Sequence, residues 1–353
     1  MSSTNATAEN TSSQASGLRL GHWLRRLIRT NEFALFSLLL IGVVLVTLRN
    51  PRFMVASNIG TLGRDIALIG LLGVGEAFTI LLGGIDLSVG SIYGLAGVLV
   101  AFFSVPPNPL QLVPSLGLPV PIAVILTLFI GTMFGVFHGL FVSKLKMHGF
   151  LITLVTLVFA RGMAVAITTG YPISGIPEDL LPIAQGTVAS IPVPFIVLII
   201  VVIIGVVFTR LTYVGRQIYA VGGNIEAARL SGVPVDARII LCYALSSFCA
   251  ALVGIIAAGR LTSGHPSAGE GAELIAIAAC VLGGISLYGG RGTIIGVLIG
   301  AMIMGSLQNA TIILEVSPYF QQMVLGLVLL AAITFDFWRR RRLNRASSNS
   351  ADR

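Results

Sequence analysis

Charged and polar side chains at a few positions in the apolar stretches are the residues best placed to do chemistry in this 353-residue sequence. Glu76 and Asp86 lie on either side of a Gly83-Gly84 pair, and Arg161 lies in a later apolar stretch. Because a charge at the centre of a bilayer costs about 2.5–3.5 kcal/mol on insertion scales, such residues are candidates for a substrate or ion pathway. We therefore predict a translocation pathway lined by these three residues and two further polar side chains: Glu76, Asp86, Ser88, Arg161 and Asn309.

Structural roles for some of these side chains stay open at this point. Asp86 could cap the helix that follows it, and Arg161 could pair with Glu76 or Asp86 and so lower the cost of burial. His138 lies in a small-residue pattern, Gly-xxx-Gly-xxx-Gly over residues 131–139, which allows helices to pack closely. We expect His138 to be a hydrogen-bonded structural residue.

Nucleotide, metal and thiol chemistry find little support in the sequence. A phosphate-binding loop ends in Gly-Lys-Ser/Thr, and the only two lysines, Lys144 and Lys146, stand in SKLKMHG, which does not fit. We therefore expect a chain that is not an enzyme and carries no cofactor, so that any ATP is bound and hydrolysed by a partner subunit. The histidines are scattered, which predicts no metal site. The cysteines lie in apolar stretches, as is typical of buried structural thiols: Cys242, Cys249 and Cys280.

The most informative polar segment between apolar stretches runs from about residue 211 to 238 and carries several charges. Residues 222–224 are expected to form a turn, and Asn224 is expected to cap a short helix over residues 225–230. Gly232 follows directly and is typical of a helix end. A short, exposed, capped helix suits a docking element, although a connector lying on the membrane surface fits the same pattern.

The elements that must position these residues are membrane helices. Hydrophobic residues make up 55% of the chain and charged residues only 10%, with a mean hydropathy of +0.95, whereas soluble domains have about 25% charged residues. We predict an all-α polytopic membrane protein. A span of about 20 apolar residues crosses a bilayer as a helix, and ten spans are expected at about 32–49, 60–82, 86–104, 120–143, 149–169, 192–211, 238–259, 271–288, 293–314 and 318–338.

The glycine pair at 83–84 leaves the region from 60 to 104 less certain. It could hold one full helix followed by a broken or re-entrant one. The same hexapeptide recurs later, since LGGIDL at 82–87 matches LGGISL at 282–287 in five of six positions. Paired glycine-interrupted segments are typical of transporters built from repeats. Five predicted spans separate the copies, so we expect an inverted repeat, unless LGG recurs only because it is common in apolar helices.

The distribution of basic residues predicts the orientation. The formal net charge of +8 comes largely from clusters that adjoin predicted spans near the two ends, and lysine and arginine mark cytoplasmic flanks. We expect both ends to be cytoplasmic. Residues 1–30 are expected to form a disordered cytoplasmic tail, residues 31–338 the transmembrane domain, and residues 339–353 a basic cytoplasmic tail. Membrane lipid, and not nucleic acid, is the partner that these clusters predict.

Four separated segments resemble the motifs of ATP-binding cassette (ABC) importer permeases of the ribose/xylose/arabinose type. In chain order they are LLGGIDLSVGSIYGLAGV, GGNIEAARLSGV, ACVLGGISLYGGRGTIIGVLIGA and VSPYFQQMVLGLVLLAAI. The resemblance extends from about residue 32 to 338. The polar N-terminal tail and the four consecutive arginines near the end are outside it.

The resemblance implies a ten-helix permease subunit of the bacterial cytoplasmic (inner) membrane. It implies a second permease copy, a cytoplasmic ATP-binding subunit and an extracytoplasmic sugar-binding protein as partners, with monosaccharide import by ATP-driven alternating access. It also implies that the 211–238 segment couples to the ATPase through Gly223, Asn224, Glu226, Ala227, Ala228, Arg229 and Gly232.

Two other classes of function are weighed against this one. An ion-coupled secondary transporter could use Glu76, Asp86 and Arg161 as a proton relay, but would leave the coupling segment unexplained. A membrane-embedded enzyme would need a catalytic cluster, and the sequence contains neither HExxH nor GxSxG.

Overall fold

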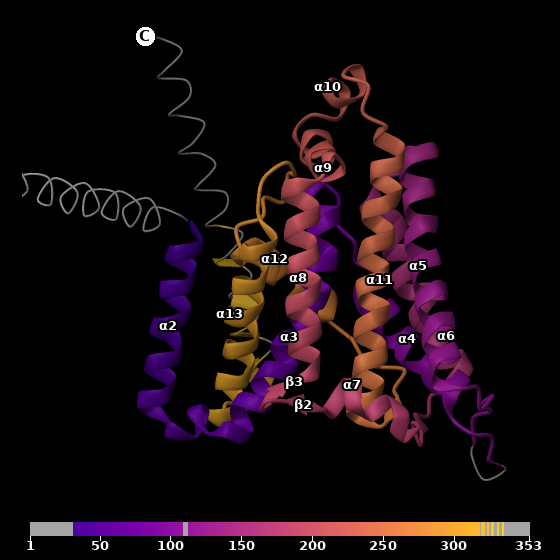
Figure 1. The fold of residues 1–353 in the computed structure, drawn as a ribbon, viewed down its shortest axis with the longest axis vertical. Coiled ribbons are helices and arrows are strands. Elements are labelled where there is room, and N and C mark those ends of the chain that lie inside the picture. Colours follow the sequence, from indigo (N-terminus) through magenta and orange to yellow (C-terminus); the bar gives the residue numbers. More distant parts are fainter. Residues whose placement is uncertain are drawn as a thin grey trace, which may run out of the picture.

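The chain folds as a bundle of membrane helices, as the sequence predicts. The computed structural model describes residues 31–108 and 112–317 and scattered positions between 319 and 334. The predicted tails at 1–30 and 339–353, and much of the predicted span 318–338, lie outside the described residues. Within the described part, six helices are long and apolar enough to cross a membrane, so the protein is a multi-pass membrane protein (Figure 1).

Nine helices build the bundle that is described. Their bounds are α2 (Asn31–Arg49), α3 (Ala56–Leu81), α4 (Val89–Ser104), α5 (Val120–Lys144), α6 (Gly149–Thr168), α8 (Val193–Leu211), α11 (Val235–Leu261), α12 (Ala272–Leu282) and α13 (Ile294–Ile313). Most agree with the predicted spans to within a few residues. The region from 60 to 104 resolves into one full helix, α3, followed by the shorter α4.

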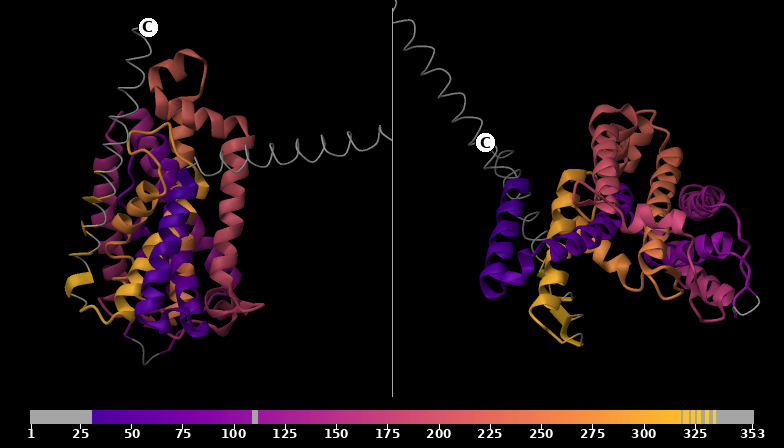
Figure 2. Two further views of the ribbon diagram at one scale, coloured as in Figure 1. Left: turned by 90° about the vertical axis from the view of Figure 1, so that its left-hand side faces the viewer. Right: turned by 60° about the horizontal axis from the view of Figure 1, so that its bottom comes forward.

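The two ends of the bundle carry different short elements. Figure 1 shows two short helices, α9 (Tyr213–Gly223) and α10 (Ile225–Leu230), together at one end. We call this the α10 end. The opposite end holds the short 3-10 helices, a five-residue helix and two antiparallel strand pairs: η1 (Pro51–Met54), η2 (Glu178–Leu180), α7 (Leu181–Gln185), β1 (Ile173–Ser174) with β4 (Ser263–Gly264), and β2 (Thr187–Val188) with β3 (Ile191–Pro192). Figure 2 shows from the side that α9 and α10 lie at one end of the bundle.

Helix α11 forms the centre of the bundle and packs against α3, α4 and α5. Glycines allow these close contacts. A methyl group on Gly135 or Gly139 of α5 would overlap the α11 backbone at Tyr243 or Ile240, and one on Gly254 of α11 would overlap the carbonyl oxygen of Tyr93. The small-residue pattern at 131–139 therefore packs one helix against another, as the sequence predicts.

Helix α12 is shorter than its predicted span at 271–288. It has only 11 residues, Ala272–Leu282. The preceding segment runs beside α4, because a methyl group on Gly264 would lie 2.6 Å from the Ala101 side chain and one on Gly269 would overlap the Gly90 carbonyl oxygen. Gly269 and Gly271 have φ of +74° and +75°, a conformation that a helix does not contain and that glycine adopts readily. This crossing is therefore part irregular segment and part helix.

The predicted inversion of the LGG repeat is wrong for these two copies. Late in α13, Gly305 lies close to Ile66 early in α3, and early in α13, Val297 lies close to Gly73 later in α3, so these two helices are antiparallel. In the same way, Gly300 lies close to Ala279 and Gly296 to Gly283, so α12 is also antiparallel to α13. Helices α3 and α12 therefore run in the same direction, and each ends in its LGG copy at the α10 end. The prediction failed because the second copy follows a separate crossing, α12, and does not interrupt a span.

Candidate functional site

The short helix at the exposed end of the bundle forms as the sequence predicts. Helix α10 covers Ile225–Leu230, and the Asn224 side chain accepts a hydrogen bond of 2.9 Å from the Ala227 N–H. This is the N-cap interaction that satisfies a free donor of the first turn. Gly232, with φ of +79°, follows the helix end. Glu226 lies in the first turn and Arg229 in the last.

Helix α10 presents apolar side chains to the outside and is fixed by one buried alanine. Ala228 is buried and packs in a cluster with Val221 of α9 and Val235 of α11. Leu230, by contrast, is 89% exposed and Ile225 is 41% exposed. Helix α10 thus presents two apolar side chains at the exposed end of the bundle.

Helix α9 was not anticipated, and residues 222–223 belong to its last turn instead of forming the predicted turn. Thr212 caps α9 by accepting a hydrogen bond of 3.0 Å from the Gly215 N–H. Ile218 and Val221 form its buried face. The capping threonine and the apolar spacing of that face are a signal in the sequence from which this helix could have been found.

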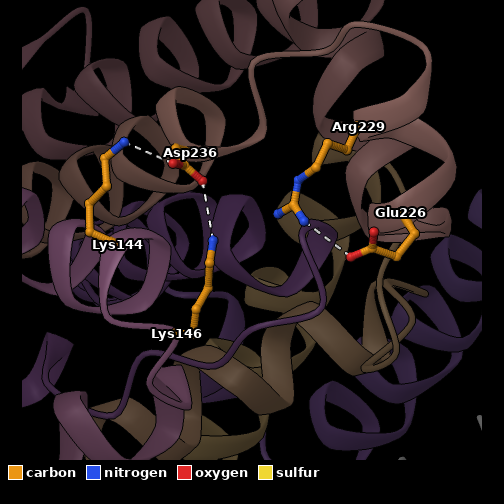
Figure 3. Close-up of polar contacts among 5 residues, drawn as sticks. All are labelled: Lys144, Lys146, Glu226, Arg229 and Asp236. Atoms are coloured by element: carbon orange, nitrogen blue, oxygen red, sulfur yellow. Dashed lines mark hydrogen bonds and ion pairs between the residues drawn. The ribbon is translucent and has the colours of Figure 1, made fainter.

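Charged pairs surround α10 and hold the ends of neighbouring helices together (Figure 3). Asp236 at the start of α11 pairs with Lys144 at 2.9 Å and with Lys146 at 3.6 Å, which ties α11 to the end of α5. Arg229 pairs with Glu226 within α10 at 3.2 Å. These pairs are largely exposed, and each contributes about 0–1 kcal/mol. They orient side chains at this surface more than they stabilise the fold.

Helix α9 connects α10 to the chain beside both LGG copies at a site that we call the glycine junction, made of residues 81–84, 222–223 and 289–292. The Gly290 N–H donates to the Leu81 carbonyl at 2.9 Å, which joins the residue before the first copy to the segment after the second. A methyl group on Gly222 would overlap the Leu81 carbonyl oxygen and lie 2.7 Å from the Gly290 nitrogen. The end of α9 therefore packs tightly against the backbone of the chain segments that follow α3 and α12.

A tyrosine strengthens this junction. The Tyr219 hydroxyl on α9 donates a hydrogen bond of 2.9 Å to the Gly292 carbonyl oxygen. Burial raises the pKa of the Tyr219 phenol, so the group stays protonated and able to donate. A displacement of α9 would consequently move both glycine-rich segments at once.

Three of the predicted pathway residues come together in a buried network. The Asp86 N–H donates to the Glu76 carboxylate at 3.0 Å. The Ser88 N–H donates to the Asp86 carboxylate at 2.9 Å, and the Ser246 hydroxyl of α11 donates to its other oxygen at 2.9 Å. All three predicted residues are buried. Asp86 satisfies the backbone donor of Ser88, which is the N-cap residue of α4, and it also accepts from α11. Asp86 is therefore not itself the cap, and the Ser88 side chain makes no capping hydrogen bond.

Arg161 and Asn309 lie apart from that network. Arg161 does not pair with Glu76 or Asp86 but donates to the carbonyl oxygens of Pro266 and Ala268 at 2.9 and 2.8 Å, which holds the irregular segment before α12. Asn309 exchanges two hydrogen bonds with Asn58, at 2.8 and 2.9 Å. Their place in a pathway stays a prediction.

His138 is hydrogen-bonded, as predicted. Its Nε2 lies 2.8 Å from the Thr156 hydroxyl, and the residue is buried between α5 and α6.

A paired substitution tests the packing around the buried network. A methyl group on Gly149 would overlap the Tyr243 hydroxyl, which is buried and has no hydrogen-bond partner. We expect Gly149→Ala to lower the thermal stability of the purified protein in detergent, and Tyr243→Phe in the same chain to restore it, since removing an unpaired buried hydroxyl costs little. Thermal unfolding of the two single variants and the double variant measures this coupling. Purely additive effects would contradict the packing.

Comparison with known proteins identifies the family. Residues 58–333 match the model of a transport family described as branched-chain amino acid transport system / permease component. This chain belongs to that permease family. The match runs from the first turn of α3 past the end of α13 and so includes α10, the glycine junction and the buried network.

Curated members of this permease family are similar over most of their length. The chain is 41% identical over 300 residues to the ribose import permease protein RbsC of Bacillus subtilis, covering 84% of this chain and 90% of the relative. It is 39% identical over 305 residues to RbsC of Haemophilus influenzae, with 85% and 91% covered. It is 32% identical over 351 residues to the xylose transport system permease protein XylH of Escherichia coli strain K12, with 82% and 87% covered. No solved structure matches the permease significantly.

Proposed function

We propose that this permease is the membrane-spanning subunit of an importer that moves a monosaccharide across the bacterial cytoplasmic membrane. The names of its relatives, ribose import permease and xylose transport system permease, support the sugar class. The exposure of Leu230 and Ile225 on α10 carries the proposal that a separate subunit drives transport. That subunit is an ATP-binding protein that docks on α10, so ATP is bound outside this chain.

The proposed mechanism is alternating access driven from α10. Closure of two ATP-binding subunits moves α10, and α9 transmits the movement because Gly222 and Tyr219 hold it against the glycine junction. The junction adjoins the ends of α3 and α12 and the segments leading to α4 and α13. A displacement there shifts four membrane segments together. The coupling residues are Gly223, Asn224, Glu226, Ala227, Ala228, Arg229 and Gly232.

The proposed topology has ten spans with both chain ends in the cytoplasm. The start of α2 lies at the α10 end, because Thr293 at the start of α13 donates to Glu32 at 3.2 Å. Basic residues gather at this end, as expected for the cytoplasmic side: Lys144, Lys146, Arg210, Arg216, Arg229, Arg238 and Arg291. The sugar-binding protein would then dock at the opposite end, and a second copy of the permease would complete the pathway.

The experiment that tests this proposal is purification of the tagged permease from its own host in mild detergent. We expect an ATP-binding cassette protein to co-purify in roughly equal amount, docked on the exposed face of α10. A folded permease that transports sugar with no ATPase bound would contradict the proposal.

The buried Glu76–Asp86 network favours one second candidate, an ion-coupled secondary transporter, because acidic side chains in spans are typical of proton relays. The two candidates differ in their energy source. Uptake by intact cells that collapses under a protonophore, while cellular ATP is maintained, would indicate the secondary transporter. Uptake that persists under the same conditions is the result that we expect.

A further inference from the structure

A cavity of about 520 Å³ lies between α12, α13 and described positions of the segment after α13. Its volume falls in the range of about 300–1,000 Å³ that is typical of sites for small molecules. Apolar side chains such as Leu274 and Leu307 form part of the lining. Hydrogen-bonding side chains form another part: Glu270, Gln308, Thr311 and Gln321. Mostly apolar walls with a few polar groups are the usual composition of a ligand site.

Two of the polar groups in this cavity, the Glu270 carboxylate and the Gln308 amide, make no hydrogen bond to another residue within the described part of the chain. The Thr311 hydroxyl and the Gln321 amide, in contrast, donate to backbone carbonyls of Gln308 and Val316. Unpaired carboxylate and amide groups in a membrane protein are costly against lipid. They indicate contact with water or with a polar ligand.

The cavity lies in the half of the bundle opposite α10. Gln308 and Thr311 belong to the last two turns of α13, whose final residue Ile313 accepts a hydrogen bond from Asn50, beyond the end of α2. Figure 1 shows α12 beside α13, with α12 confined to the half nearer α10. Glu270 therefore marks the level at which the crossing changes from irregular segment to helix. Interrupted helices of this kind form substrate sites in many transporters.

Two of the predicted pathway residues hold the walls of the cavity in place. Arg161 binds the carbonyls of Pro266 and Ala268 and so fixes the segment that leads to Glu270. Asn309, next to Gln308, is locked to Asn58 by two hydrogen bonds. The groups that would contact a ligand are thus positioned by partly buried polar contacts behind them, as a precise site requires.

We propose that this cavity binds the sugar during its passage, with Glu270 and Gln308 hydrogen-bonding its hydroxyl groups; the inference rests on the proposed function. A sugar hydroxyl both donates and accepts, so it satisfies a carboxylate, which only accepts, and an amide, which does both. A lipid chain satisfies neither. The apolar carbons of the sugar ring match Leu274 and Leu307. Arg161 and Asn309 act here as positioning residues.

The test is uptake into proteoliposomes that hold the permease with its ATP-binding subunit, supplied with the sugar-binding protein and ATP. The probes are radiolabelled ribose and xylose. We expect Gln308→Leu to lower the uptake rate at limiting sugar by about tenfold or more, as expected for one lost hydrogen bond. Glu270→Gln, which replaces a charge-assisted hydrogen bond with a neutral one, should lower the uptake rate by about fivefold. ATP hydrolysis without sugar should persist in both. Gln308→Asn, which keeps the amide, should retain more uptake than Gln308→Leu. Ser306→Ala, a polar-to-apolar change on α13 outside the cavity lining, should import like the unmodified protein.

A labelling measurement covers the case in which a variant assembles poorly. Gln308→Cys in membrane vesicles should react with a small charged thiol reagent, and the imported sugar should slow the reaction. The three native cysteines are buried, so the unmodified protein is the background control. No reaction would mean that lipid or a second permease copy fills the cavity.

Three results would overturn the inference, and they differ in what else they affect. Wild-type uptake by both Gln308→Leu and Glu270→Gln, or absence of labelling at position 308, overturns the cavity assignment and leaves the proposed function standing. Failure of the unmodified assembly to import either sugar counts against the proposed function as well.

Discussion

Replacing Leu230 with aspartate should abolish sugar uptake while the permease remains folded in the membrane. Leu230 is 89% exposed on α10, so the substitution removes no internal packing. If Leu230 is a hot spot of the proposed interface, its truncation costs about 2 kcal/mol, and an aspartate buried there adds the cost of removing its charge from water. We expect uptake to fall by at least about 30-fold, the equivalent of that energy. Uptake and membrane abundance, measured in the same cells, test this prediction.

Matched variants separate loss of docking from loss of folding. Leu230→Met keeps an apolar side chain of similar size and should transport normally. Ala228→Pro breaks α10 and removes the contact of Ala228 with α9 and α11, so it should abolish uptake like the aspartate variant. Glu226→Arg should also abolish uptake, since it reverses the charge of the first turn. Full uptake by Leu230→Asp and Glu226→Arg would contradict the proposal that α10 couples the permease to the ATP-binding subunit.

The second large effect is expected at the glycine junction. Gly222→Ala should uncouple α9 from the membrane helices, because the added methyl group would overlap the Leu81 carbonyl oxygen and approach Gly290. Both neighbours are backbone atoms, which cannot rotate away as a side chain can. The end of α9 must therefore shift or the junction must open. We expect loss of uptake and a lowered thermal stability, with ATP hydrolysis by the docked subunit no longer linked to sugar.

A glycine outside the junction is the control for this prediction. Gly42 of α2 has no heavy atom within 4 Å of an added methyl group. Gly42→Ala should therefore transport and unfold like the unmodified protein. Uptake by Gly222→Ala equal to that by Gly42→Ala would show that tight packing at the junction is not needed to transmit movement.

Local sequence signals predicted the parts of this structure that depend on local chemistry. The apolar stretches gave most spans to within a few residues because a bilayer forces each to form its own backbone hydrogen bonds. Asn224 predicted the start of α10 because capping is decided within one turn. His138 was expected to be hydrogen-bonded, and it is, since a polar ring among close-packed helices needs a partner.

Contacts between distant segments could not be predicted in this way. The partner of Arg161 is the backbone near Ala268, about a hundred residues away, and not the acids that charge alone would suggest. The direction of the second LGG copy depends on whether residues 263–282 cross the bundle. A glycine-rich, partly irregular segment that crosses the bundle is difficult to recognise from its hydropathy. The cavity beside α12 required Glu270 and Gln308 to be brought together by the same crossing.

The central claim is that α10 receives the energy for transport from a separate ATP-binding subunit. Its most direct test is sugar uptake by proteoliposomes that contain the permease and the co-purified ATPase. The α10 end and ATP are inside the vesicles, and the sugar-binding protein is outside, at the opposite end of the permease. We predict uptake that needs ATP and is lost in Leu230→Asp but kept in Leu230→Met. Uptake driven by a proton gradient by the permease alone, equal in the two variants, would contradict the claim.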